Sequence, residues 1–190
     1  TVAGYKYEYD VNNNLTKLSQ TVAGRTWNVN YTYDKDNRAK TATLDNGVVI
    51  TNNYDAIGRL TTRTIRLSAT NTYTTALTYV GGANGGKTAL VSTYQNGTDA
   101  KYNYTYDANG NITEIWRGST TFASAAEKYS YEYDAANQLT RENLFYASGN
   151  SNNATYTYEY DSWGNLLNKY TYTYTTGSLT GSAPSNPGTP

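Results

Sequence analysis

The stretch YTYDANGNIT at residues 104–113 is compatible with two different structures. Its first half alternates aromatic and polar residues up to Asp107, as a strand does, and a short run of turn-forming residues follows. Asp107, Asn109 and Asn111 also alternate in the way that oxygen ligands do in the first half of a calcium loop. The stretch therefore predicts either the tip of a β-hairpin or part of a cation site.

The Tyr-Asp pair of this stretch recurs along the chain at spacings of 21 to 27 residues, when Tyr79-Val80 is counted as a degenerate copy. A recurrence this regular is typical of an array of similar units, each of which buries its surface against its neighbours. The intact copies are Tyr9-Asp10, Tyr33-Asp34, Tyr54-Asp55, Tyr106-Asp107, Tyr133-Asp134 and Tyr160-Asp161.

The residues that follow each Asp obey a second rule. The residue three positions later is always Gly or Asn, the two residue types that best tolerate a positive φ, and the residue five positions later is always apolar. This pattern predicts a tight hairpin turn. The first set is Asn13, Asn37, Gly58, Gly110, Asn137 and Gly164, and the second is Leu15, Ala39, Leu60, Ile112, Leu139 and Leu166.

In such a turn we expect the Asp carboxylate to accept backbone N–H groups, as in Asx turns. We also expect the Tyr before each Asp to pair across the hairpin with the apolar residue, because that register places both on one face. The predicted structural turn residues are Asp10, Asp34, Asp55, Asp107, Asp134, Asp161, Gly58, Gly110 and Gly164.

The residues on either side of the turns have the character of strands. Tyrosines occupy every second position before the Asp, as in Tyr102, Tyr104 and Tyr106, which predicts one tyrosine-rich face and one polar face. A second strand follows each turn, for example over 111–116. We predict an all-β fold of repetitive antiparallel β-hairpins that form a curled or spiralling sheet, with the tyrosines packed in its core.

Composition sets the domain boundaries and the excluded chemistry. Residues 1–174 contain about seven hairpin repeats, and residues 175–190, which hold all 3 prolines, are predicted to be a Gly/Ser/Pro-rich linker or loop. The chain has no Cys and no His, which excludes thiol catalysis, disulfides and His-based relays. We therefore expect no enzymatic activity, no catalytic residues and no cofactor.

Charge and hydropathy restrict the partners. The 15 basic and 15 acidic residues cancel, so no net field favours nucleic acid. No apolar run approaches the roughly 20 residues of a membrane helix, and the N-terminal TVAGYKYEYD does not have the pattern of a signal peptide.

Two motifs resemble ligand sites without meeting their requirements. An EF-hand loop that starts at Asp107 would need Gly at position six and Glu at position twelve, where Ile112 and Gly118 stand, so no metal site is predicted. The string GGANGGKT at 81–88 formally matches a phosphate-binding loop. A strand-like segment follows it instead of the required helix, so no phosphate site is predicted either.

Two surfaces remain open to partners. Trp163 occupies a turn position where other turns carry Ala, Asn or Ile, and it is the candidate ligand contact, for example with a glycan. Trp27 and Trp116 lie in strands and are expected to be packed. Open edges of the sheet also predict edge-to-edge self-association.

The stretches YTYDANGNIT, YDAIGRLT, YEYDAANQLT and YEYDSWGNLL resemble the YD-repeat (Rhs-repeat) family over residues 1 to about 174. In that family, which includes bacterial Rhs and wall-associated proteins and the C subunits of insecticidal toxin complexes, arrays of β-hairpins form a hollow shell around a C-terminal toxin. The resemblance implies a fragment of shell wall from a secreted or bacterial surface protein, whose partners are the rest of its parent chain and the enclosed toxin. A carbohydrate-binding or adhesive surface is the alternative. The family's self-cleaving aspartates near an Asp-Pro-x-Gly motif have no counterpart here, so no proteolytic role is implied.

Overall fold

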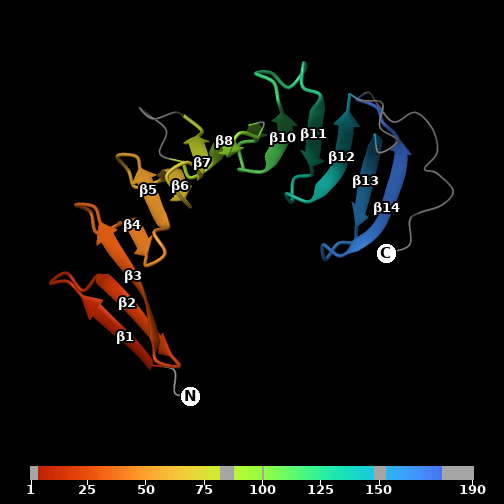
Figure 1. Ribbon diagram of the computed structural model, residues 1–190. Helices are drawn as coiled ribbons and strands as arrows, with labels where there is room; N and C mark the ends of the chain where they lie inside the picture. Colours follow the sequence, from red (N-terminus) through yellow and green to blue (C-terminus); the bar gives the residue numbers. More distant parts are fainter. Residues whose placement is uncertain (1–3, 82–87, 100, 148–152, 177–190) are drawn as a thin grey trace. The chain divides into compact units, whose positions relative to one another are not determined.

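A computed structural model describes residues 4–81, 88–99, 101–147 and 153–176. Among these residues there are fourteen β-strands and no helix (Figure 1). No described helix is thus long and apolar enough to cross a membrane. Most of the glycine-rich segment 81–87 and of the predicted linker 175–190 lies outside the described residues.

The strands are short, five to nine residues each. In chain order they are β1 (Gly4–Tyr9), β2 (Leu15–Val22), β3 (Arg25–Tyr33), β4 (Ala39–Leu44), β5 (Val49–Tyr54), β6 (Leu60–Arg66), β7 (Thr72–Tyr79), β8 (Val91–Asn96), β9 (Tyr102–Tyr106), β10 (Ile112–Arg117), β11 (Glu127–Tyr133), β12 (Leu139–Tyr146), β13 (Ala154–Tyr160) and β14 (Leu166–Thr173).

The strands follow one another in the sheet in the order of the chain. The chain divides into two compact units, Thr1–Ala89 with Tyr94–Asp99, and Leu90–Thr93 with Ala100–Pro190. Within the first unit each strand from β1 to β7 pairs antiparallel with the next, and the same holds within the second unit from β9 to β14. The predicted all-β fold of antiparallel hairpins is confirmed.

The register across each Tyr-Asp turn is the predicted one. In all six hairpins the Tyr before the Asp pairs with the apolar residue five positions after it, from Tyr9 with Leu15 to Tyr160 with Leu166. The register then shifts by one residue, which is the signature of a β-bulge. Threonine commonly fills this bulge: the hydroxyls of Thr16, Thr61 and Thr140 each donate to the carbonyl of the opposite strand at 3.1 Å.

The sheet has almost no hydrophobic core. Among the described residues, strands contact only their neighbours in the chain, and the buried apolar side chains are Ala125 and Ala154. The expectation of tyrosines packed in a core is wrong, because no second layer covers them. Tyr5 and Tyr7 are more than half exposed, and most others lie half-buried along the sheet.

The left-handed residue of each turn can be tested at Gly110, whose φ is +89°. A β-branched side chain is strained at that φ, so Gly110→Val is expected to lower the free energy of unfolding by about 1–3 kcal/mol. Thermal and denaturant unfolding measure this change. Gly110→Asn is the matched control, because Asn137 holds the same position at φ +63° and the space around Gly110 is open; equal stability of both variants would contradict the assigned strain.

Candidate functional site

The Tyr-Asp turn is the repeated polar site of the chain, and the turn at Asp107 shows its construction. The Asp107 N–H donates to the Asn111 carbonyl at 3.0 Å, and the Gly110 N–H donates to the Asp107 carbonyl at 3.2 Å. One carboxylate oxygen accepts the N–H groups of Asn109 and Asn111, each at 2.9 Å, and the other accepts the Asn111 side-chain amide at 2.9 Å. This is a three-residue hairpin loop whose last residue is left-handed.

The other five aspartates hold the same position. Each accepts the backbone N–H groups two and four residues later at 2.8–3.1 Å. In four of them the side chain four residues later also donates to the second carboxylate oxygen; these donors are Asn14, Arg38, Arg59 and Asn165. The Asp side chain therefore organises the loop that reverses the chain.

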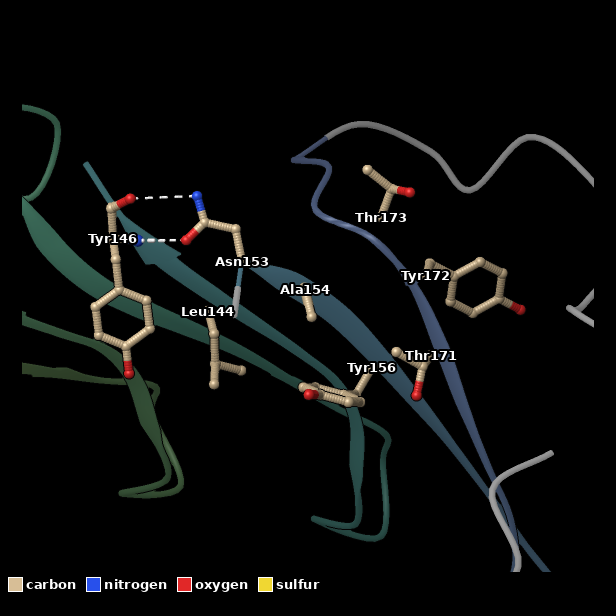
Figure 2. A pocket seen from close by; sticks show the side chains of 8 residues that line it. All are labelled: Leu144, Tyr146, Asn153, Ala154, Tyr156, Thr171, Tyr172 and Thr173. Atoms are coloured by element: carbon tan, nitrogen blue, oxygen red, sulfur yellow. Dashed lines mark hydrogen bonds between the residues drawn. The ribbon is translucent and has the colours of Figure 1, made fainter. Parts of the chain in front are cut away.

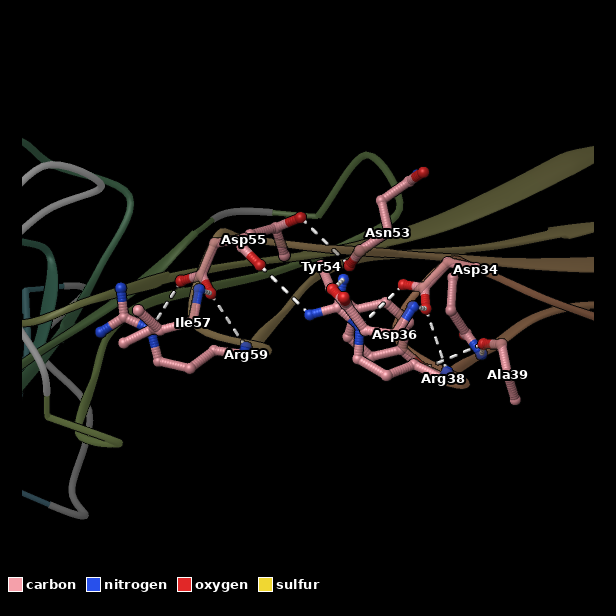
Figure 3. A network of polar contacts seen from close by, with 11 residues as sticks. Asp34, Asp36, Arg38, Ala39, Asn53, Tyr54, Asp55, Ile57 and Arg59 are labelled. Atoms are coloured by element: carbon pink, nitrogen blue, oxygen red, sulfur yellow. Dashed lines mark hydrogen bonds and ion pairs between the residues drawn. The ribbon is translucent and has the colours of Figure 1, made fainter. Parts of the chain in front are cut away.

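The residue four positions after Asp also reaches the next turn in the array, and we call it the bridge residue. Asn14 donates to the side-chain oxygen of Asn37 at 3.0 Å, and Asn111 donates to that of Asn137 at 2.8 Å. The longer Arg38 instead reaches the main-chain carbonyl of Asp55 at 3.4 Å (Figure 3).

A long bridge residue is followed by a glycine in the next turn. A Cβ added to Gly58 would lie 3.3 Å from the Arg38 guanidinium, and one added to Gly164 would lie 3.1 Å from the Gln138 amide. An asparagine bridge is followed by an asparagine that accepts its bond. The bridge and the left-handed residue of the next turn are therefore matched in size and in hydrogen-bonding capacity.

Tyrosine hydroxyls join each hairpin to the one before it. The Tyr before the turn donates to the carbonyl of the residue that follows the preceding turn, at 2.7–3.0 Å in all six junctions between described residues. The pairs are Tyr33 to Leu15, Tyr54 to Ala39, Tyr79 to Leu60, Tyr106 to Val91, Tyr133 to Ile112 and Tyr160 to Leu139. The degenerate copy at Tyr79 thus keeps the bond although it has lost the Asp. We call this bond the tyrosine lock.

Arginine bridges support the lock. The Arg38 guanidinium lies 4.8 Å from the centre of the Tyr54 ring, and that of Arg59 lies 4.4 Å from the Tyr79 ring. Each arginine thus binds its own aspartate and covers the locking tyrosine of the next hairpin.

Ionisation in the turns follows from these bonds. The Asn111 side-chain amide, together with the backbone N–H groups of the loop, holds the pKa of Asp107 below its ordinary value. The Asn165 side chain does the same for the pKa of Asp161. Burial raises the pKa of Tyr106 and Tyr133, so that their hydroxyls stay protonated donors.

The metal-like alternation around Asp107 has a different use in the structure. Both carboxylate oxygens accept N–H groups, and Asn109 and Asn111 direct their amide nitrogens to Asn137. No group of three or more acidic side chains that could hold a metal ion occurs in the part of the chain that the structure describes. The polar side chains of this turn therefore form hydrogen bonds within the turn and to the next turn, at Asn137.

The three tryptophans differ in their surroundings. Trp163 is 88% exposed at the tip of its turn, and its backbone N–H donates to the Asp161 carboxylate at 2.9 Å. Trp116 is packed as expected: its indole N–H donates to the Ser119 carbonyl at 3.2 Å and its ring meets Phe122 edge-on. The expectation for Trp27 is wrong, because the residue is 48% exposed, with the Arg25 guanidinium 6.0 Å from the centre of its ring.

A groove of about 630 Å³ lies over β12, β13 and β14 in the second unit (Figure 2). Asn153 in its lining exchanges two hydrogen bonds with the main chain of Tyr146, at 2.7 and 3.2 Å. Among the described residues its lining includes Leu144, Ala154, Tyr156 and Thr171 and contains no carboxylate or amine.

This arrangement of strands is similar to that of several solved structures. No protein-family model and no curated protein matches the sequence. Among solved structures, the crystal structure of TcdB2-TccC3-Cdc42 is similar with a TM-score of 0.67 and 18% identity, over 85% of this chain and 9% of that one. TcdB2-TccC3-TEV is similar with a TM-score of 0.67 and 17% identity, over 87% of this chain and 9% of that one.

The crystal structure of TcdB2-TccC3 without its hypervariable C-terminal region gives a TM-score of 0.65 at 18% identity, again over 85% and 9%. The chain therefore has the fold of the matched part of these TcdB2-TccC3 chains. It spans less than a tenth of the length of the chains it matches.

Two features of the Tyr-Asp site were not predicted from the sequence: the tyrosine lock and the bridge residue. The locking role of the tyrosine hydroxyl is hidden because its acceptor is a carbonyl, which any residue provides. The bridge had a visible signal, since the residue four positions after every Asp is Asn, Arg or Gln, all side chains with N–H donors.

The Tyr-Asp turns make the stability of the fold depend on acid pH. The folded-state pKa values of Asp10, Asp107 and Asp161 lie below the ordinary value of about 3.9, so the stability that these carboxylates contribute is present above that pH and is lost as pH falls through the lower folded pKa values. Denaturant unfolding is expected to show falling stability below about pH 4. Asp161→Asn should reduce this dependence and Asp99→Asn, outside the Tyr-Asp turns, should not; equal profiles for both would contradict the role of the turn carboxylate.

Proposed function

We propose that the chain is a non-enzymatic structural segment of a YD-repeat shell wall, in a secreted or bacterial surface protein that encloses a C-terminal toxin. The tyrosine lock carries this proposal. The characteristic polar groups of the motif, Tyr hydroxyl and Asp carboxylate, are used to hold one hairpin to the next and to form the turn. Both groups therefore form hydrogen bonds that stabilise the array of hairpins.

Three observations agree with a wall. The likeness to TcdB2-TccC3 structures covers most of this chain and a small share of theirs, as expected for one section of a larger array. The described residues that line the groove over β12–β14 include no carboxylate and no amine. A single-layer wall also fits the near absence of buried apolar side chains among the described residues.

The lock can be removed with little change in shape. Tyr133→Phe and Tyr160→Phe together are expected to lower the free energy of unfolding by about 1 kcal/mol per lost hydrogen bond. In the longer polypeptide that would contain this segment, the same pair should make the enclosed region more sensitive to protease. Tyr31→Phe is the control, because its hydroxyl has no hydrogen bond with a described residue. If the tyrosine variants lower the stability of the sheet but leave the protease sensitivity of the C-terminal region unchanged, the proposal that the sheet encloses this region is wrong.

The alternative is a glycan-binding or adhesive surface, favoured by the 88% exposure of Trp163. The variant Trp163→Ala should keep the fold, since Ala136 holds the equivalent position and its N–H makes the same bond to Asp134 at 2.8 Å. A glycan array followed by calorimetric titration tests binding. If the native chain binds no glycan above background, this alternative is wrong; if it binds, Trp163→Ala should abolish most of the signal.

A further inference from the structure

The chain contains four Asn-Gly pairs, a dipeptide that is prone to spontaneous deamidation. In this reaction the main-chain nitrogen of the glycine attacks the side-chain amide carbon of the asparagine, and a glycine has no Cβ to obstruct the attack. The pairs are Asn46-Gly47, Asn84-Gly85, Asn96-Gly97 and Asn109-Gly110. The second pair lies outside the described residues. The other three have different surroundings, from which an order of reactivity follows.

Two of the pairs stand in the same kind of three-residue loop. Between β4 and β5 the Leu44 N–H donates to the Val48 carbonyl and the Gly47 N–H donates to the Leu44 carbonyl, both at 2.9 Å. The Asp107 turn makes the same two bonds, and Gly47 and Gly110 have φ values of +85° and +89°. The space around both glycines is open. The asparagines of these two pairs are therefore equivalent in position, and Leu44 stands where the other loop has Asp107.

The two loops differ in what holds the N–H group that follows the glycine. In the second loop the Asp107 carboxylate accepts the Asn111 N–H at 2.9 Å. A leucine cannot accept it, and in the first loop the side-chain oxygen of Asn46 itself accepts the equivalent Val48 N–H at 3.1 Å. This bond draws the side chain of Asn46 forward along its own main chain, toward the Gly47 nitrogen. It also stabilises negative charge on the amide oxygen, as an oxyanion hole does.

The loop around Asn46 is anchored to β3. The Asp45 N–H donates to the Asn28 carbonyl at 3.3 Å, and the Asp45 carboxylate accepts the Asn28 backbone N–H at 2.7 Å and its side-chain amide at 2.9 Å. The reacting groups are therefore held near one another before the reaction, which lowers the entropic part of its barrier. Asn46 itself is exposed, so that water reaches it.

The equivalent Asn109 is restrained by its neighbours. Its amide nitrogen, which would have to leave as ammonia, donates to the side-chain oxygen of Asn137 at 2.9 Å. Deamidation would break this bond, so the bond adds to the barrier. The N–H group that activates Asn46 has its counterpart in Asn111, which is held by the Asp107 carboxylate.

The pair at the end of β8 is restrained in another way. The Gly97 N–H donates to the Thr74 carbonyl at 2.7 Å, which opposes the loss of the proton that precedes attack. The side-chain oxygen of Asn96 accepts the Thr75 hydroxyl at 3.1 Å. A Cβ added to Gly97 would lie 2.9 Å from the Tyr73 ring, so this ring crowds the glycine where a new ring would have to form.

We propose that Asn46 is a self-modification site at which the chain deamidates through a succinimide. The Gly47 nitrogen loses its proton and bonds to Cγ of Asn46, the bond from Cγ to Nδ2 breaks, and ammonia leaves with that proton. Water then opens the ring, at Cγ to give an aspartate or at the main-chain carbonyl to give an isoaspartyl linkage. Either product adds a negative charge to a chain whose 15 basic and 15 acidic residues cancel. The isoaspartyl form also lengthens the loop that pairs Leu44 with Val48.

Deamidation rates at the separate pairs test this assignment. The native chain is incubated in mildly alkaline buffer, and mass spectrometry of its peptides, after chromatographic separation of isoaspartyl forms, measures each loss of amide. Asn46 is expected to react about two- to tenfold faster than Asn109, the range that one hydrogen bond sets, and Asn96 is expected to be slower than both. In concentrated denaturant the ratio of the first two rates should fall. Equal rates in the native chain, or a ratio that denaturant leaves unchanged, would overturn the proposal.

Two variants exchange the surroundings of the equivalent pairs. Leu44→Asp supplies the missing carboxylate, which should take the N–H group now bound to Asn46 and slow its deamidation. Asn137→Gly removes the acceptor of the Asn109 amide, and it should speed deamidation there while leaving Asn46 unchanged. Glycine holds this position in sister turns, and circular dichroism checks the fold of both variants. Asn37→Gly is the matched control and should alter neither rate. If Asn137→Gly leaves the rate at Asn109 unchanged, the proposal is wrong, whether or not Leu44→Asp folds.

Discussion

The tyrosine lock is the interaction on which the described structure depends most. A sheet that buries almost no apolar side chain cannot be held by a core, so its strands depend on their ladders and on contacts along the sheet. The lock adds one side-chain bond per junction at a fixed position, from the end of one strand to the exit of the preceding turn. Its retention at Tyr79, where the Asp is missing, indicates that joining hairpins is a stricter requirement than the form of the turn.

The Asp turn makes the lock possible because it fixes where the chain re-enters the sheet. The carboxylate holds two backbone N–H groups, the left-handed residue completes the reversal, and the apolar residue then pairs with the tyrosine across the hairpin. That apolar residue offers its carbonyl to the next tyrosine. One displaced turn would therefore misplace two tyrosines, its own and that of the following hairpin.

Much of this could be predicted from the residues. Asn or Gly three positions after Asp, and an apolar residue five positions after it, gave the hairpin and its register because φ and side-chain direction are local constraints. The surroundings of the tyrosines could not be predicted. An alternating aromatic strand has the same pattern whether a second layer covers it or not, so both the tyrosine core and the packed Trp27 were wrong.

The matching of bridge and acceptor could be predicted only in part, because each position taken alone accepts more than one residue type. Read singly, the third position after Asp tolerates Gly or Asn, and the fourth tolerates Asn, Arg or Gln. Taken across neighbouring turns, these choices are coupled: Asn14 requires the oxygen of Asn37, whereas Arg38 requires the empty space at Gly58. A hairpin is thus fitted to the one that follows it, and two hairpins with the same consensus are not interchangeable. The order of repeats is encoded in residue pairs about 20 to 26 positions apart, a separation at which only the folded sheet brings them together.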